Sequence, residues 1–355
     1  MDRKLAMFPM NRNQCAMARH ASLLQGYHFS SFLMPSYKHP LNGVDISCLD
    51  GGDAVGAVLT AYSKEALQQS DVLFIAYDDV IKDMAVYFEV LNDATQLGIE
   101  IITTRQLADK LGKAPTPPEA CALTRAETET DKLLEIETPV ISVFAQGMRT
   151  DQLAVELSLR EFFLGLGYKV SQVGACEAGQ FFGFPCMPQF MHEPSDAYHK
   201  ILDFNTHVKD IEEREQPEVM ILGVPGAIMK FGDRDLQGLG ILPFIVANAV
   251  PSDEAILCTY YAKYEDAYYE ELDHFFQYRL GCHLRFINIA NTSTLPDLTT
   301  AGAKTSIFDV SSEFVMPYIN AVHGDYTVSN VLSRGSSQKM CQGIQVALTN
   351  NTLRM

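Results

Sequence analysis

The stretch from Pro139 to Gly183 constrains the fold most, because it has the pattern of a strand, a glycine turn, a helix and a second strand. Its opening run, 140–144, is mostly β-branched and aromatic, as a buried parallel strand requires. Gly147 then allows a sharp turn, and Thr150 or Asp151 can cap the helix that follows. Such a unit places backbone N–H groups and a helix N-terminus at the carboxyl end of a strand, where many α/β proteins bind phosphate.

The loop after this strand lacks the residues of a Walker A phosphate-binding loop. In that motif a lysine reaches the terminal phosphates, and the hydroxyl of the next residue holds magnesium. Here Gln152 stands at the lysine position and Leu153 stands at the hydroxyl position. Two interpretations stay open: a nucleotide bound through Arg149 and Thr150, or a helix start with a structural role only.

The chain of 355 residues is long enough for two α/β domains. Residues 1–112 predict a small Rossmann-like domain, residues 113–138 an acidic linker that contains prolines, and residues 139–355 a degenerate P-loop-like domain with a C-terminal extension. Strands that alternate with helices predict parallel sheets in both domains. The strands expected in the first domain are Lys4–Phe8, Tyr27–Met34, Val72–Tyr77 and Glu100–Thr104, and its clearest helix is Asp79–Leu97.

The second domain continues with the same alternation after its first unit. The expected strands are Tyr168–Val173, Glu218–Val224, Ala255–Tyr261 and Leu284–Ile289. The expected helices are Ser195–Arg214, Gly240–Val250, Glu265–Leu280, Ser312–Val322 and Ser337–Leu348.

Composition narrows the classes of partner. The net charge of −17 argues against nucleic acid or an anionic membrane as the main partner, because both require clustered lysine and arginine. Neither a signal peptide nor a membrane span is expected, so the predicted location is the cytoplasm. The eight cysteines include no C-x-x-C pair and are expected to be reduced, mostly buried thiols that bind no metal.

Three loops that follow strands of the second domain form the predicted site. They are expected to meet at the carboxyl edge of one sheet, where α/β proteins bind ligands. Arg149 and Lys230 would contact an anion, and Glu177 would act as general acid or base. The ligand-binding residues predicted with them are Gly147, Thr150, Asp151, Gly179, Gly183, Pro225 and Gly226.

Two further patterns have alternative interpretations. His199, Asp203 and His207 recur on one face of a helix, which suits either a metal site or, with the many charges nearby, a solvated face. A tyrosine-rich region in 260–278 predicts either a subunit or peptide surface, which makes a homo-oligomer one possibility, or a plain interface inside the protein.

Several motifs, taken in their order along the chain, resemble the peptide-maturation-system proteins that are encoded beside radical-SAM enzymes and small precursor peptides. The resemblance spans about residues 3–290 and is weak in the tail. The motifs that carry it are Lys4–Pro9, Asp50–Gly52, Gln152–Arg160, Tyr168–Gly174, Phe182–Pro185, Gly223–Gly226 and Gly240–Val246.

More distantly, the layout resembles P-loop proteins of the dethiobiotin-synthetase type with an N-terminal Rossmann-like domain, some of which are amino-acid N-acyltransferases. In that pattern a lysine would stand at Gln152. The resemblances together imply an accessory protein that matures a ribosomally made peptide, with a precursor peptide or a maturation enzyme as partner. The alternatives are a scaffold without catalysis, or an N-acyl or phosphoryl transferase that acts on an amino acid or peptide. The cofactor stays unknown, with a nucleotide as one candidate.

Overall fold

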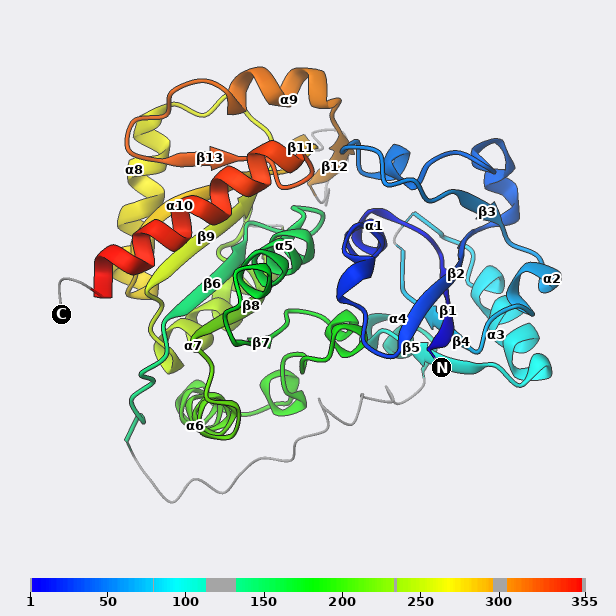
Figure 1. The fold of residues 1–355 in the computed structure, drawn as a ribbon, viewed down its shortest axis with the longest axis horizontal. Coiled ribbons are helices and arrows are strands. Elements are labelled where there is room, and N and C mark those ends of the chain that lie inside the picture. Colours follow the sequence, from blue (N-terminus) through cyan, green and yellow to red (C-terminus); the bar gives the residue numbers. More distant parts are fainter. Residues whose placement is uncertain (1, 79, 113–131, 233–234, 296–304, 353–355) are drawn as a thin grey trace.

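The computed structural model describes residues 2–352 except 79, 113–131, 233–234 and 296–304. Two parallel sheets stand side by side, each with helices packed on it (Figure 1). The predicted α/β class with two parallel sheets is therefore confirmed.

The first sheet has five parallel strands in the order β3-β2-β1-β4-β5. β1 and β4 lie at its centre. β4 and the last four residues of β1 are apolar and buried, as expected for strands covered on both faces. The chain moves outward from β1 in one direction and then returns to add β4 on the other side, so the topological switch point lies between β1 and β4. The strands are β1 (Arg3–Phe8), β2 (Tyr27–Met34), β3 (Leu59–Ala61), β4 (Val72–Ile75) and β5 (Glu100–Thr103). The helices are α1 (Arg12–Arg19), α2 (Lys64–Leu67), α3 (Ala85–Leu97) and α4 (Arg105–Lys110).

The second sheet has six parallel strands in the order β13-β10-β9-β6-β8-β7. α5 and α10 pack on one face of it, and α6, α7 and α8 pack on the other. The strands are β6 (Val140–Ala145), β7 (Val170–Val173), β8 (Val219–Ala227), β9 (Glu254–Thr259), β10 (Leu284–Ile289) and β13 (Thr327–Ser329). The helices are α5 (Gln152–Gly165), α6 (Ala197–Glu215), α7 (Ile241–Ala249), α8 (Asp266–Phe275), α9 (Ser312–Ile319) and α10 (Arg334–Thr352). A separate antiparallel pair is formed by β11 (Thr292–Leu295) and β12 (Ser306–Asp309).

One apolar cluster contains side chains from both halves. α1 lies against α5 between the sheets (Figure 1), and Leu157 of α5 is buried among side chains of the first sheet. The 3₁₀ turn Glu177–Phe182, which follows β7, also reaches the first sheet. There the Phe181 ring packs edge-on against Tyr27 and Phe74, at centroid distances of 5.2 and 5.1 Å. Because this loop belongs to the second half but packs in the first, it joins the halves.

The sequence missed two edge strands and misplaced one helix start. β3 and β13 have three residues each, too few to show an alternating pattern. The helix expected from Asp79 begins at Ala85, because Asp78 and Asp83 accept backbone hydrogen bonds two residues on and form turns first. The predicted linker lies mostly in residues 113–131, outside the described residues, so the domain boundaries stay predictions.

The cysteines need one correction. Cys186 is disulfide-bonded, whereas all eight were expected to be reduced. Burial raises the pKa of the thiols of Cys15, Cys258 and Cys341, so these three are poor nucleophiles. Six of the described cysteines are free thiols: Cys15, Cys48, Cys176, Cys258, Cys282 and Cys341.

Candidate functional site

The glycine loop between β6 and α5 is held by its own residues. The Thr150 hydroxyl donates to the Gly147 carbonyl at 2.9 Å and is buried. The Arg149 guanidinium donates to both carboxylate oxygens of Asp309, at 2.8 and 3.0 Å. The hydroxyl and the cation that were expected to contact a nucleotide therefore have partners within the protein.

Gln152, at the position of the Walker lysine, closes the loop onto the sheet. Its side-chain Nε2 donates to the backbone carbonyls of Val143 in β6 and Val224 in β8, both at 2.8 Å. A lysine at this position in a P-loop points to the phosphates. Here the side chain instead ties two neighbouring strands together.

Aromatic side chains fill the space next to Gly147. The Tyr260 hydroxyl donates to the Met148 carbonyl at 2.7 Å, and a Cβ added at Gly147 would overlap that hydroxyl. The same Cβ would come within 3.2 Å of the Phe231 ring. Gly147 is therefore required for close packing of Tyr260 and Phe231, whereas the positive φ angles of this turn belong to Arg149 and Asp151.

Asp151 connects the two halves of the protein. It stands at the N-cap position of α5 but makes no side-chain capping bond. Its two carboxylate oxygens instead accept from Nε and Nη2 of Arg12 in α1, both at 2.7 Å. Burial lowers the pKa of Arg12, but the neighbouring carboxylates, Asp151 first, outweigh burial and raise it. Burial also raises the pKa of Asp151, and Arg12 opposes that rise. The two short, parallel hydrogen bonds are those of a bidentate ion pair.

The third predicted loop lies beside the first. The Ile228 N–H donates to the Ala145 carbonyl at 2.9 Å, which brings the end of β8 next to the glycine loop. Pro225 and Gly226 belong to β8 itself, and Gly226 has the positive φ of 84° that a glycine tolerates. Lys230 is exposed and has interactions within the protein. Neither pocket described below includes residues of these two loops.

The remaining predicted loop, with Glu177, points to the first sheet. The Glu177 carboxylate accepts from the Arg105 N–H at 3.3 Å, at the start of α4. Gly179 lies so close to the Phe184 ring that a Cβ would overlap it, and Gly183 likewise adjoins the side chain of Gln25. All three loops were expected around one crevice, and the structure brings only two of them together.

Glu177 lines a cavity of about 330 Å³, which we name the switch-point pocket. It lies where β4 and β5 end, beside the N-terminal part of α1, which is the edge at which open α/β sheets bind ligands. Its wall carries the Arg105 cation and the Asp109 and Glu177 carboxylates. The side-chain oxygen of Gln14, a residue of this wall, is buried and has no hydrogen-bond partner among the described residues. The full lining is Asn13, Gln14, Met17, Phe74, Ala76, Tyr77, Thr104, Arg105, Gln106, Asp109, Leu153, Cys176, Glu177 and Ala178.

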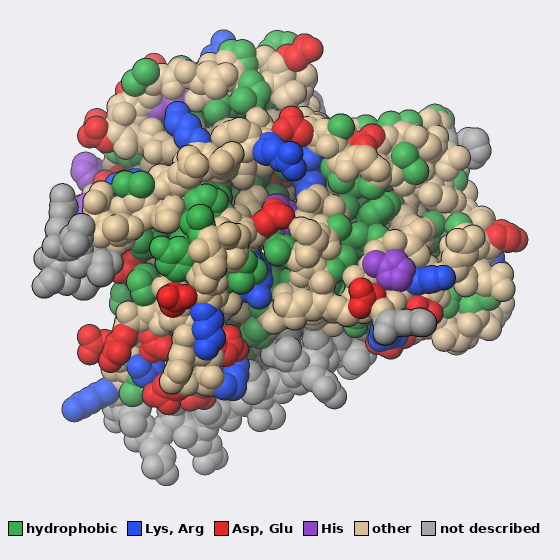
Figure 2. All heavy atoms as spheres, viewed as in Figure 1, with side chains coloured by type: hydrophobic (Ala, Val, Ile, Leu, Met, Phe, Trp, Pro, Cys, Tyr) green, Lys and Arg blue, Asp and Glu red, His purple; other side chains and the backbone are tan. Residues whose placement is uncertain are grey.

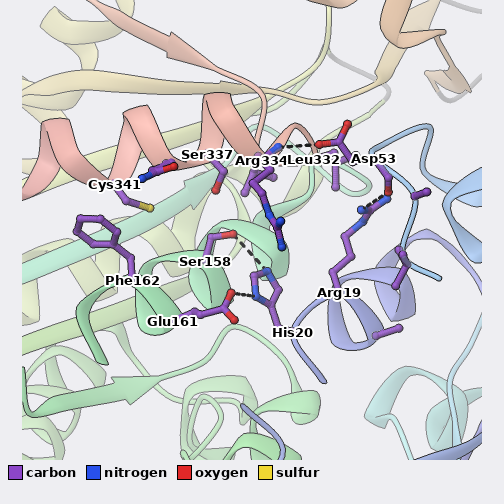
Figure 3. A pocket seen from close by; sticks show the side chains of 15 residues that line it. Arg19, His20, Asp53, Ser158, Glu161, Phe162, Leu332, Arg334, Ser337 and Cys341 are labelled. Carbon is purple, nitrogen blue, oxygen red and sulfur yellow. Dashed lines mark hydrogen bonds and ion pairs between the residues drawn. The ribbon is translucent and has the colours of Figure 1, made fainter. Parts of the chain in front are cut away.

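A second cavity of about 520 Å³, the junction pocket, lies where α1, α5 and the start of α10 meet. Figure 3 shows Arg19 and His20 from the end of α1, Ser158 and Glu161 from α5, and Arg334 from α10 around it. The Arg19 guanidinium is paired with Asp50, whose carboxylate accepts two hydrogen bonds from it at 2.7 and 2.8 Å. The Arg334 side chain forms no ion pair with the described residues, although its backbone N–H donates to Asp53 at 2.9 Å.

Ser158, His20 and Glu161 form a chain of hydrogen bonds at the wall of the junction pocket. Ser158 Oγ lies 3.2 Å from His20 Nε2, and His20 Nδ1 lies 2.8 Å from Glu161 Oε2 (Figure 3). This set was not predicted from the sequence, because His20 lies far from the other two residues along the chain. The only local signal was a serine and a glutamate three positions apart on a largely apolar helix.

The face of α6 with His199, Asp203 and His207 is not the solvated face that the charges nearby suggested, because Asp203 is 3% exposed and His207 is half-buried, while His199 alone of the three is exposed. Figure 2 shows acidic and basic side chains gathered over α6. His199 contacts its own N-cap residue Asp196 at 2.6 Å, and burial lowers the pKa of His207 to about 4. Among the residues that the structure describes, no group of three His, Cys, Asp or Glu side chains could hold a metal ion.

The tyrosines mostly pack against each other inside the second half. Tyr264 and Tyr268 stack with their centroids 4.6 Å apart, and the Tyr269 and Tyr318 hydroxyls are 2.5 Å apart. Tyr278, in contrast, is 89% exposed. A homo-oligomer or peptide surface in this region stays a prediction. None of the described helices is long and apolar enough to cross a membrane.

The fold resembles a known structure although the sequence does not reveal a family. No protein-family model and no curated protein sequence matches the chain. A DUF1611 family protein from Anabaena variabilis matches with a TM-score of 0.60 and 11% identity, over 97% of this chain and 99% of that one. A pseudomurein peptide ligase type C from Methanothermus fervidus matches with a TM-score of 0.25 and 10% identity, over 72% of this chain and 38% of that one, which supports no argument. The first likeness shows that this chain has the fold of that DUF1611 family protein over nearly its full length.

Proposed function

We propose that the protein is a cytoplasmic accessory protein in the maturation of a ribosomally made peptide, and that it binds a short charged segment of that peptide in the switch-point pocket. The observation that carries the binding site is the place of Glu177, Arg105 and Gln14 in one cavity at the carboxyl edge of the first sheet. The link to peptide maturation is supported by the sequence resemblance, whose motifs Gln152–Arg160 and Phe182–Pro185 flank the loop with Glu177.

The charges of the pocket suit a ligand that carries both signs. Arg105 can bind a carboxylate, while Glu177 and Asp109 can bind an ammonium group. A volume of about 330 Å³ accommodates one or two amino-acid residues, so the terminus of a peptide is the ligand that fits best.

The glycine loop offers less support for a nucleotide or an acyl donor. The Gln152 amide bonds two strand carbonyls, and Tyr260 packs against Gly147. A transferase that uses this loop would have to displace both side chains. We therefore favour peptide binding over phosphoryl or acyl transfer at the glycine loop.

Calorimetric titration with the precursor peptide encoded beside the gene tests this function. We expect binding that weakens about tenfold in Glu177→Gln and in Arg105→Gln, because each change removes a charged hydrogen-bonding partner. Glu213→Gln, at an exposed position of α6, is the matched control and should leave the affinity unchanged. Titration with ATP, GTP and acetyl-CoA should give no heat. Absence of peptide binding, or equal affinity in all variants, would contradict the proposal.

A further inference from the structure

We propose that Ser158, His20 and Glu161 form a second, catalytic site in the junction pocket, with the roles of nucleophile, general base and orienting carboxylate. The order of contacts is that of a serine hydrolase: hydroxyl to one imidazole nitrogen at 3.2 Å, and the other nitrogen to a carboxylate at 2.8 Å. This inference goes beyond peptide binding and uses a different cavity.

The ionisation state of Glu161 determines where the hydrogen atoms of this set lie. The hydrogen bond with His20 lowers the pKa of Glu161, so Glu161 is ionised and can only accept. His20 Nδ1 must then carry the hydrogen, which leaves the lone pair of the neutral ring on Nε2. Among the residues that the structure describes, the donor that faces Nε2 is the Ser158 hydroxyl, which is the arrangement that a nucleophilic serine requires. Ser22 also donates to Glu161, at 3.0 Å, and fixes the carboxylate.

The surroundings indicate the class of substrate. Ser158 is 7% exposed, and it faces a cavity of about 520 Å³ that is large enough for an acyl chain. Phe162 and Leu332 give that cavity apolar walls. Arg334 adds a cation that lies close enough to lower the pKa of Glu161, and it can stabilise a negative oxygen. An ester or thioester of an apolar acyl group fits this combination.

The reaction is an acyl transfer to water. Ser158 Oγ bonds to the carbonyl carbon while its proton passes to His20 Nε2, and the carbonyl oxygen becomes negative beside Arg334. The bond from carbon to the leaving oxygen or sulfur then breaks, and His20 gives its proton to the leaving alcohol or thiol. Water repeats the sequence on the acyl-serine: His20 takes a proton from the water, the acid leaves, and the proton returns to Ser158.

An alkyl fluorophosphonate tests the nucleophile directly, because Ser158 Oγ would bond to phosphorus and displace fluoride. Peptide mapping by mass spectrometry should find one adduct, at Ser158. The labelling rate should fall by about 100-fold in His20→Gln, as expected when a general base is removed. Ser195→Ala is the control, because Ser195 is exposed and lines neither pocket. It should label at the rate of the unmodified protein.

Two further measurements separate catalysis from a structural role. Hydrolysis of p-nitrophenyl hexanoate should be lost in Ser158→Ala, while the urea midpoint of this variant stays close to that of the unmodified protein. If His20→Gln does not fold, Glu161→Gln replaces it and should slow labelling by at least about tenfold. Absence of an adduct at Ser158, labelling at an unchanged rate in a folded base variant, or unchanged hydrolysis in Ser158→Ala would overturn the proposal.

Discussion

The Arg12 guanidinium and the Asp151 carboxylate face each other in two parallel hydrogen bonds of 2.7 Å, with both side chains 4% exposed. Arg12 belongs to the helix that follows β1, and Asp151 to the turn that follows β6. The connection that follows β1 in the first sheet is thereby joined to the connection that follows β6 in the second sheet. Arg12 also donates to the carbonyls of Asp50 and Asn291, so one side chain contacts segments from across the chain.

Replacing Arg12 by Leu should destabilise the protein strongly. The change leaves the Asp151 carboxylate buried without its partner, which typically costs about 3–5 kcal/mol. Urea unfolding monitored by circular dichroism measures the free energy. Arg3→Ala breaks an exposed ion pair with Glu100 and should cost less than about 1 kcal/mol. Equal losses of unfolding free energy in Arg12→Leu and Arg3→Ala would contradict the role given to burial.

Replacing Gln152 by Ala should lower the free energy of unfolding by about 1–3 kcal/mol, because the carbonyls of Val143 and Val224 lose a donor in a buried region. The exposed Gln342→Ala on α10 should be nearly neutral when both variants are unfolded in urea.

Gln152→Lys restores the Walker lysine but leaves Tyr260 and Phe231 in place. It should therefore not create binding of magnesium ATP, and measurable heat on titration would show that the loop can open.

Replacing Gly147 by Ala should cost about 1–3 kcal/mol, because the new methyl group overlaps the Tyr260 hydroxyl and crowds the Phe231 ring. In a Tyr260→Phe background the cost should be smaller by at least about 0.5 kcal/mol, since the overlapping oxygen is gone. Gly165→Ala, where a Cβ meets nothing within 4 Å, should be neutral or slightly stabilising. A cycle of the four Gly147 and Tyr260 variants in urea gives the coupling energy.

Glu156 should make the protein less stable as the pH rises. It is 0% exposed, and burial raises its pKa to about 8, well above the value near 4.5 of an unfolded chain. The folded state therefore binds more protons than the unfolded state between these two values, and stability falls by a few kcal/mol across that window. Glu156→Gln removes this contribution. The variant should gain stability relative to the unmodified protein from about pH 5 to pH 8, and a constant difference in urea titrations would contradict the assignment.

The sequence patterns placed the main strands and helices well because burial leaves a clear signature. β10 runs from Leu284 to Ile289 as predicted, and β6 begins at Val140, the first residue of the predicted run 140–144. The patterns gave the wrong role for a side chain whose hydrogen-bond partner lies far away in the sequence. Asp151 was interpreted as a possible helix cap, yet its carboxylate binds Arg12 of α1 in the other half. The residues next to Asp151 in the sequence do not indicate such a partner.

The site residues illustrate the same limit. The loops with Gly147 and Lys230 adjoin each other because β6 and β8 are neighbours in the sheet, as the fold class implied. Glu177 was placed with them, but β7 lies at the sheet edge and its loop continues to the first sheet, driven by burial of Phe181 and Phe182. The junction pocket was not predicted at all, because it depends on how the two halves pack.

The junction pocket has walls from Ala18 near one end of the chain and from Cys341 near the other. A nascent polypeptide cannot possess it until α10 has emerged from the ribosome and packed beside α5. Any chemistry that the pocket performs therefore begins only after α10 has been synthesised and has packed beside α5.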